Sequence, residues 1–275
     1  MISPMPQISI CNTIFLYQVV NPMPLMYYNI ASLRLNASYA SHQAGFGAYS
    51  EGTSDDFNKA IWSALYSDTS LSVQDIVNQY TNYFFGSICG PLVATIIFSL
   101  EQNWKGDLVT NTNVPYTVQL LQTLQTLVIP EQLLSNWRLQ AYLYRGYYDA
   151  YVQTRLSFET LLLSNAYTTL AYANINSTVE SINAVIAILN SDDTNPARQQ
   201  LRDQVIKFSG MLQKGITGNV LECQEPNLGL DTIDSRISDV IYLQTTCMAL
   251  ILYYSYFYYF FTIVVKAQNN LSYFV

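Results

Sequence analysis

Charge is scarce in this chain. Only 11% of its 275 residues are Asp, Glu, Lys or Arg, whereas ordinary soluble domains carry roughly a quarter. The 12 Lys and Arg residues are outnumbered by 19 Asp and Glu residues, so the formal net charge is -7. A chain poor in basic residues lacks the electrostatic footprint of a nucleic-acid-binding protein. Because half of the residues are hydrophobic, the composition predicts a folded protein and excludes extended disorder.

Metal-binding and nucleophilic residue types are also few. Cys11, Cys89, Cys223 and Cys247 are far apart in the sequence, so no thiolate cluster for zinc or iron–sulfur is expected. Isolated thiols of this kind usually act as small buried hydrophobic residues, although the sequence leaves their disulfide status open. His42 is the only histidine, and no motif of a catalytic triad surrounds it. We expect no metal and no cofactor, because a glycine-rich phosphate loop is missing as well.

Long uncharged stretches raise the question of a membrane segment. Residues 76–100 and 108–130 contain many amides together with Gly and Pro residues, which is typical of helices in a soluble fold. Residues 246–265 have only three non-aromatic polar residues, and their length suits a bilayer core roughly 30 Å thick. They are therefore a candidate transmembrane helix. Their tyrosines favour a membrane–water interface over the bilayer centre, and a buried helix or a divergent end on a soluble domain are the alternatives.

The N-terminus has no clear signal peptide. Residues 1–24 contain no Lys or Arg and are interrupted by four prolines, whereas a secretory leader has a basic region before an unbroken apolar run. Three glycosylation sequons begin at Asn36, Asn176 and Asn270, and they matter only in an exported chain. We favour an extracytoplasmic or membrane-associated location over a cytoplasmic one.

Capping residues and helical periodicity predict an all-α fold. Ser72 and Asp75 have the spacing of a capping box, several prolines suit the first turns of helices, and Gly86 is placed to end a helix. Short connections such as 174–177 favour antiparallel neighbours. The predicted helices are 55–67, 72–85, 91–103, 115–128, 131–173, 178–190, 196–222 and about 235–265. We expect a bundle of long antiparallel helices with a short irregular N-terminal segment and a hydrophobic C-terminal helix.

The longest predicted helix, 131–173, carries one apolar stripe. Its members recur at three- and four-residue steps: Leu134, Trp137, Ala141, Tyr144, Tyr148, Tyr151, Phe158 and Leu162. Arg145 with Asp149 and Arg155 with Glu159 have i,i+4 spacing, which predicts ion pairs on the helix surface. The tyrosines of residues 142–151 fit packing in the core better than an aromatic groove for a sugar.

A glycine-flanked loop before the first predicted helix contains the candidate catalytic carboxylate, Glu51. Loops ahead of helices are common places for chemistry, and most glycosidases use two carboxylates across the scissile bond. The alternative is a solvent-exposed glutamate that the helix dipole favours. Residue spacing alone favours the solvent-exposed glutamate over the catalytic carboxylate.

The segment Tyr49-Ser-Glu-Gly-Thr-Ser-Asp-Asp-Phe-Asn-Lys59 resembles the junction between barrel and helical tail in large bacterial-type glycoside hydrolases. These are similar to the α-N-acetylglucosaminidase and α-glucuronidase groups. Three further segments resemble the helical C-terminal region of such proteins: Gln79-Tyr-Thr-Asn-Tyr-Phe-Phe-Gly86, Leu100-Glu-Gln-Asn-Trp-Lys-Gly106 and Asn136-Trp-Arg138. The whole resemblance covers roughly residues 45–240.

The resemblance implies that Glu51 is an active-site carboxylate, acting as nucleophile or acid. It implies in addition that Tyr49, Asp55 and Asp56 lie near a bound carbohydrate. Ser50 stands where the family has a proline, and only about 45 residues precede the motif, whereas a barrel needs about 250. We therefore expect a helical accessory domain that is catalytically incomplete alone and meets carbohydrate through a missing or separate barrel domain.

This interpretation divides the chain into three parts. Residues 1–53 are an irregular remnant of a preceding domain and carry the Glu51 loop, residues 54–240 form the helical domain, and residues 241–275 form the hydrophobic tail.

Two other functions are compatible with the sequence. One is a membrane-anchored helical protein without catalysis, held by residues 246–265. The other is a soluble helix-bundle interaction module.

Overall fold

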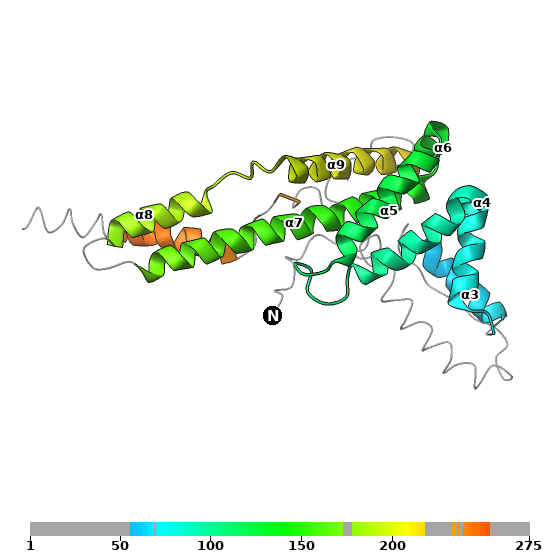
Figure 1. Ribbon diagram of the computed structural model, residues 1–275, viewed down its shortest axis with the longest axis horizontal. Helices are drawn as coiled ribbons and strands as arrows, with labels where there is room; N and C mark the ends of the chain where they lie inside the picture. Colours follow the sequence, from blue (N-terminus) through cyan, green and yellow to red (C-terminus); the bar gives the residue numbers. More distant parts are fainter. Residues whose placement is uncertain are drawn as a thin grey trace, which may run out of the picture. The chain divides into compact units, whose positions relative to one another are not determined.

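Helices account for all regular secondary structure in the residues that the structure describes (Figure 1), which confirms the all-α fold. This computed structural model describes residues 56–68, 70–172, 178–217, 233–234, 236 and 239–253. The elements are α3 (Asp56–Ser67), α4 (Val73–Gln102), α5 (Asn113–Leu127), α6 (Pro130–Ser135), α7 (Trp137–Ala171), α8 (Thr178–Leu189), α9 (Pro196–Thr217) and a helix over Asp239–Tyr253.

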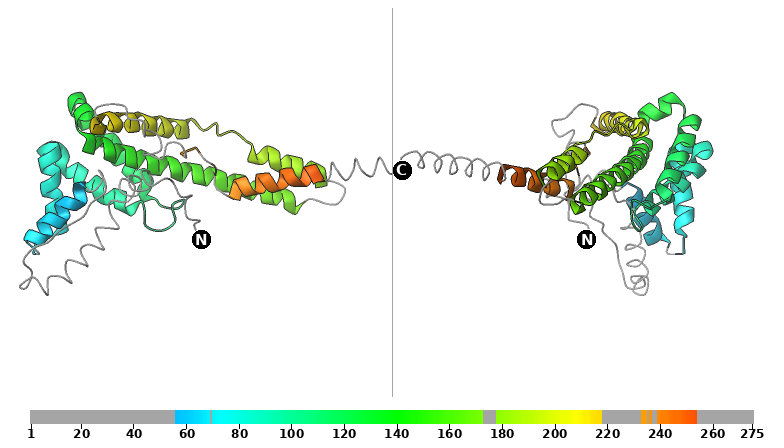
Figure 2. Two further views of the ribbon diagram at one scale, coloured as in Figure 1. Left: turned by 180° about the vertical axis from the view of Figure 1, so that it is seen from behind. Right: turned by 60° about the vertical axis from the view of Figure 1, so that its left-hand side comes forward.

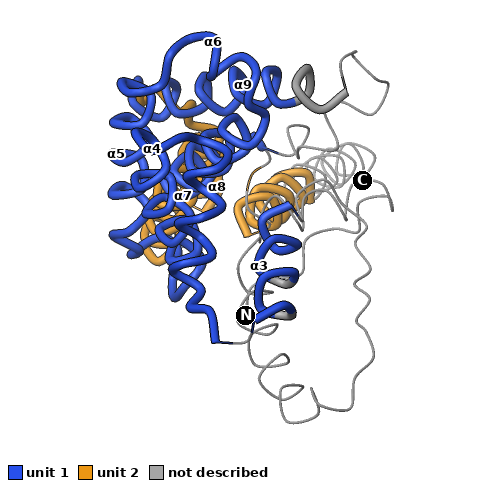
Figure 3. The backbone as a smooth tube through the Cα atoms, turned by 90° about the vertical axis from the view of Figure 1, so that its right-hand side faces the viewer, with its two compact units in different colours: residues 1–154, 196–234 blue, residues 155–195, 235–275 orange. Residues whose placement is uncertain are grey.

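The chain divides into two compact units (Figure 3). Unit 1 comprises residues 1–154 and 196–234, and unit 2 comprises residues 155–195 and 235–275. Helix α7 contributes its N-terminal part to unit 1 and its C-terminal part to unit 2. Of the predicted parts of the chain, residues 1–53 lie outside the described residues, and the tail 241–275 is described as far as Tyr253.

Helix α4 begins where its sequence predicts, but it joins the two predicted helices 72–85 and 91–103 into one element that has Pro91 inside it. The Ser72 hydroxyl accepts the N–H of Asp75 at 3.1 Å, which caps the helix, and donates to the Asp75 carboxylate at 2.6 Å. At Gly86 the backbone has φ 77° and ψ 169°, so two helical segments meet there at a kink. A positive φ of this kind favours glycine because it has no Cβ.

The predicted helix 131–173 is wrong as a single element, because the chain breaks at Asn136. That residue has φ −97° and ψ 94°, and its side-chain oxygen accepts the N–H groups of Arg138 at 3.1 Å and Leu139 at 3.3 Å. Asn136 therefore ends α6 and caps the start of α7. Leu134, which the predicted stripe placed in the core, belongs to α6 and is exposed.

The core of unit 1 surrounds the N-terminal part of α7. Tyr147 of α7 stacks on Phe208 of α9, with ring centroids 5.8 Å apart. Gly146 allows close approach to α5, since a Cβ there would lie 2.3 Å from Leu121 Cδ1. The tyrosines at 144, 147 and 151 are buried in this core, as the packing interpretation predicts.

Neither predicted ion pair of α7 lies on the surface. The Arg145 guanidinium is 2.7 Å from the Asp149 carboxylate, and both side chains are at most 3% exposed. Arg155 and Glu159 pair at 2.5 Å and are largely buried as well. The i,i+4 spacing identified the partners correctly. It could not reveal that neighbouring elements would cover this side of α7.

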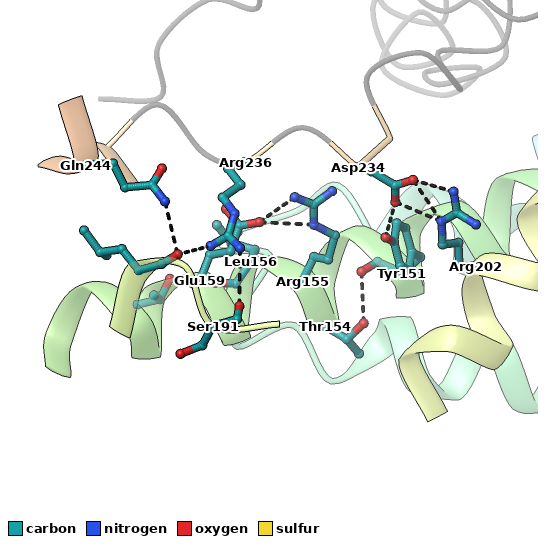
Figure 4. Close-up of polar contacts among 12 residues, drawn as sticks. Tyr151, Thr154, Arg155, Leu156, Glu159, Ser191, Arg202, Asp234, Arg236 and Gln244 are labelled. Atoms are coloured by element: carbon teal, nitrogen blue, oxygen red, sulfur yellow. Dashed lines mark hydrogen bonds and ion pairs between the residues drawn. The ribbon is translucent and has the colours of Figure 1, made fainter. Parts of the chain in front are cut away.

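Unit 2 packs three helical segments around a small apolar core. Figures 1 and 2 show α8 and the Asp239–Tyr253 helix beside the C-terminal part of α7. Their buried side chains are Leu162, Ala166, Ile182, Val185, Leu189, Val240, Leu243 and Cys247. Arg236 and Gln244 donate to the carbonyl oxygen of Leu189 at 2.5 and 3.2 Å (Figure 4). These bonds satisfy the C-terminal end of α8.

Among the described residues, one helix is long and apolar enough to cross a membrane, and it is α4. Half of its most apolar window is buried within the protein, where Val77, Val93 and Ile96 contribute to the core of unit 1. The candidate span 246–265 is described only to Tyr253. Cys89 and Cys247 are buried free thiols, while Cys11 and Cys223 lie outside the described residues.

Candidate functional site

Asp56 is the only predicted site residue within the described part of the chain. Tyr49, Glu51 and Asp55 lie outside it. Asp56 is the first residue of α3, where the helix dipole favours a negative charge. The contacts of Asp56 therefore show how the chain is held where the Glu51 segment joins the helical domain.

Three donors from two other helices converge on the Asp56 carboxylate. Arg138 Nε donates to Oδ2 at 2.6 Å, and Arg138 Nη2 donates to Oδ1 at 2.7 Å. The Tyr80 hydroxyl donates to Oδ2 at 2.6 Å. A bidentate arginine–carboxylate pair fixes direction as well as distance. The start of α3 is thus attached to α4 through Tyr80 and to α7 through Arg138.

Aromatic rings hold the Arg138 guanidinium in place. Its Cζ lies 3.8 Å from the centroid of Phe84 and 4.5 Å from that of Trp137. Such cation–π contacts stabilise an arginine that is partly removed from water. In addition, the Asn136 amide donates to the carbonyl oxygen of Phe84 at 3.0 Å, which joins the start of α7 to α4. We call Asp56, Tyr80, Phe84, Trp137 and Arg138 the Asp56 cluster.

The electrostatics of this cluster keep Asp56 ionised. Partial burial opposes ionisation, but the hydrogen bonds from Arg138 and Tyr80 and the positive charge of Arg138 hold the pKa of Asp56 below its ordinary value. Burial, Tyr142 and the carboxylate of Asp56 raise the pKa of Tyr80. A carboxylate whose two oxygens both accept charge-assisted hydrogen bonds stays ionised at neutral pH and is therefore poorly suited to act as a general acid. Its geometry fits a residue that positions the chain.

The cluster joins three of the sequence segments that carry the glycoside hydrolase resemblance. Asp56 comes from 49–59, Tyr80 and Phe84 come from 79–86, and Trp137 and Arg138 come from 136–138. Sequence periodicity gives no sign that Asp56 and Arg138 pair, because they are 82 positions apart. The only signal that could have found Arg138 was its place in the Asn-Trp-Arg segment.

A second polar centre lies deep in unit 1, around the buried pair of Arg145 and Asp149. The Asn103 amide donates to Asp149 Oδ2 at 2.9 Å, and Thr117 and Asn113 donate to Asn103 Oδ1 at 3.0 and 2.7 Å. The Arg145 guanidinium lies 4.1 Å from the Trp104 ring centroid. This network attaches the loop between α4 and α5 to α7.

Burial disfavours the charged form of both partners in this network. It raises the pKa of Asp149, which the charge of Arg145 and the hydrogen bond from Asn103 oppose, and it lowers the pKa of Arg145, which Asp149 opposes. Each residue thus offsets part of the cost of burying the charge of the other. A pair of this kind is costly to break and fits a structural role for the Leu100–Gly106 segment.

In the part of the chain that the structure describes, no three His, Cys, Asp or Glu side chains gather in a way that could hold a metal ion. Comparisons of the chain with family models, with curated proteins and with solved structures give no match. The function must therefore be inferred from the sequence segments and from their placement in the fold.

Proposed function

We propose that this protein is a helical accessory domain of the glycoside hydrolase type, which presents the Glu51 loop to a catalytic barrel and does not hydrolyse a glycoside by itself. The observation that supports this proposal best is the Asp56 cluster. Three separate segments that resemble glycoside hydrolases meet in it, and it holds the residue at which the Glu51 segment enters α3.

The cluster anchors the residue from which the Glu51 segment continues. Glu51 is five positions before Asp56 in the sequence. Since the carboxylate of Asp56 is fixed by Arg138 and Tyr80, it acts in this proposal as a positioning residue for Glu51.

The chemistry expected of the complete site needs two carboxyl groups. One protonates the leaving glycosidic oxygen, and the other attacks the anomeric carbon or activates water. In this proposal Glu51 is one of them, the barrel supplies the other, and Tyr49 and Asp55 contact the sugar. Hydrolysis by the isolated chain is not expected, because a lone carboxylate can perform only half of this chemistry.

The test joins this chain to the barrel of an α-N-acetylglucosaminidase in place of that enzyme's own helical region. Hydrolysis of 4-nitrophenyl α-N-acetylglucosaminide is then measured for the hybrid and for its Glu51→Gln variant. Because acid–base catalysis contributes about 10²- to 10⁴-fold, the variant is expected to lose at least about a hundredfold in kcat. A folded hybrid whose rate does not depend on Glu51 would remove Glu51 from the mechanism.

Two further variants separate catalysis from positioning. Arg138→Met removes the bidentate bond and keeps an apolar stem against Phe84 and Trp137, so kcat is expected to fall while the pH profile of the reaction keeps its shape. Glu180→Gln alters an exposed carboxylate of unit 2 and serves as the matched control, with an unchanged rate expected.

A further inference from the structure

Unit 2 exposes an unusual amount of apolar side-chain surface. Ten of the eighteen large hydrophobic side chains that are exposed in the described residues belong to this smaller unit. Six of the ten lie on one helix: Ile241, Tyr242, Met248, Leu250, Leu252 and Tyr253. Contiguous exposed apolar surface in a folded protein usually marks an interaction site.

The Asp239–Tyr253 helix is apolar on both of its faces. Its inner face places Val240, Leu243 and Cys247 in the core of unit 2. Its outer face carries Met248 and Leu252, which are 50% and 71% exposed. An amphipathic surface helix has polar residues on the outer face, whereas a helix that is apolar all round is buried in protein or in lipid.

Charges in unit 2 gather at one end of the three packed segments. Arg236 donates to the carbonyl oxygens of Leu189 and Ser191, which places it at the C-terminal end of α8 beside the exposed Asp192 and Asp193. The Asp239–Tyr253 helix starts there, where Gln244 contacts Leu189 and Asn190, and it runs antiparallel to α8 (Figures 1 and 2). Tyr253 therefore lies toward the opposite end.

That opposite end has little charge. Residues 160–172, at the end of α7 and just after it, and residues 240–253 contain no Asp, Glu, Lys or Arg, and α8 contributes only Glu180 in its first turn. This end of unit 2 exposes Tyr167 of α7 and Tyr172 just after it, together with Leu252 and Tyr253. Tyrosines beside apolar residues are typical of the membrane–water interface.

The sequence after Tyr253 is also uncharged and rich in aromatic and aliphatic residues. No charged residue occurs from 240 to 265, and Lys266 is the first to follow. The next residues, Tyr-Ser-Tyr-Phe-Tyr-Tyr-Phe-Phe-Thr-Ile-Val-Val, are almost entirely aromatic or aliphatic. A sequence of this composition is unfavourable in contact with water and favourable in contact with a lipid bilayer.

We propose that the outer face of the Asp239–Tyr253 helix docks on the surface of a phospholipid bilayer, at the charge-poor end of unit 2. This goes beyond the function proposed above and does not depend on it. The contact is hydrophobic and not electrostatic, because the chain is acidic and basic side chains are rare in it. It therefore requires no anionic lipid and resists salt.

The first experiment is flotation of the full chain with neutral phosphatidylcholine vesicles at low and at high salt. Binding under both conditions is expected. Changing Met248, Leu252 and Tyr253 together to serine should lower the partition coefficient at least tenfold, since each removes buried apolar area. The matched control changes three exposed residues of unit 1, Tyr83, Ile88 and Tyr116, to serine and should bind as the wild type does.

The second experiment shows where lipid touches the chain, even if residues after 253 alone hold it on the vesicle. A Leu252→Trp variant is mixed with vesicles of brominated lipid, with Tyr83→Trp and the wild-type chain, which has three tryptophans of its own, as controls. Quenching beyond that of the wild type is expected for Leu252→Trp and not for Tyr83→Trp. Absence of quenching at position 252 would overturn the proposal, as would binding that needs anionic lipid or is abolished by salt.

A second copy of this chain is the main competing occupant of the same face. If it covers the face, size-exclusion chromatography without lipid will give a dimer that the triple serine variant converts to a monomer, and the tryptophan at position 252 will not meet lipid. That combination would overturn the proposal. A wild-type chain that elutes at the same position as the triple variant, and whose Leu252→Trp form is quenched, supports it.

Discussion

The Asp56 cluster allows a quantitative prediction for Asp56→Asn, which keeps the shape of the side chain and removes its charge. Exposed ion pairs contribute about 0.2–1 kcal/mol, and breaking a fully buried pair costs about 3–5 kcal/mol. The side chains of Asp56 and Arg138 are 29% and 20% exposed, so this pair lies between the two limits. We expect the free energy of unfolding to fall by about 2 kcal/mol.

Two features of the site moderate the loss. The asparagine oxygen can still accept the Tyr80 hydroxyl, which now donates at 2.6 Å. The guanidinium of Arg138 keeps its contacts with Phe84 and Trp137, each of which stabilises a cation. The part that disappears is the charge–charge attraction and the strength of the two charge-assisted hydrogen bonds.

The assay is urea unfolding followed by far-UV circular dichroism, carried out as a double-mutant cycle with Arg138→Met. A coupling energy of about 1–2 kcal/mol is expected between residues in direct contact. Asp68→Asn is the matched control. The carboxylate of Asp68 is exposed and, among the described residues, accepts hydrogen bonds from Ser70, two residues away, so no measurable change is expected.

The pH dependence of this effect has a definite sign. The pKa of Asp56 is lower in the folded protein than its ordinary value, so its ionised form stabilises the fold above the unfolded pKa of about 3.9. The stability difference between the wild type and Asp56→Asn should be constant near neutral pH and shrink as the pH falls below about 4. A coupling energy of zero, or a difference that grows on acidification, would refute the reasoning.

Three further substitutions test other parts of unit 1 by the same unfolding assay. Asp149→Asn leaves the buried Arg145 without a countercharge and is expected to cost about 3–5 kcal/mol. Gly146→Ala places a Cβ 2.3 Å from a methyl group of the fully buried Leu121 and should cost about 1–3 kcal/mol by overpacking. Ser72→Ala removes the N-cap of α4 and should cost about 1 kcal/mol.

Each of these substitutions has a control in the same unit. Asp203→Asn changes an exposed carboxylate that bonds only to Gln199, and little effect is expected. Gly210→Ala adds a Cβ where no atom lies within 4 Å, so helix propensity should make it neutral or stabilising by up to about 1 kcal/mol. If Gly146→Ala and Gly210→Ala behave alike, close packing of α5 against α7 is not what requires Gly146.

Helix identity could be predicted from the sequence because its signals are local. The cap at Ser72 and the proline starts of α6 and α9 depend on residues within one turn of each other, whereas Gly86, which was expected to end a helix, kinks α4 instead. The break at Asn136 was missed, although it is local too. An asparagine inside an apolar periodic pattern is ambiguous, since it can either face solvent or cap a helix.

The candidate site could be predicted only in part. The resemblance selected the segments that contain Asp56, Tyr80 and Arg138, but it assigned a role near bound carbohydrate to Asp56. Its pairing with Arg138 depends on how α3 packs against α7, and no local pattern contains that information. The stretch with Tyr49, Glu51 and Asp55 lies outside the described residues, so their roles stay predictions.

The sequence by itself determined that this protein is all-α and where most of its helices begin, because caps and periodicity act over three or four residues. The low content of charged residues also means that few charged side chains are available to cover the surface that faces water. Only the tertiary structure decided which of its few charges are buried. Arg145 and Asp149 have the spacing of an ordinary surface pair, yet neighbouring elements cover them, and burial depends on contacts between residues far apart in the chain.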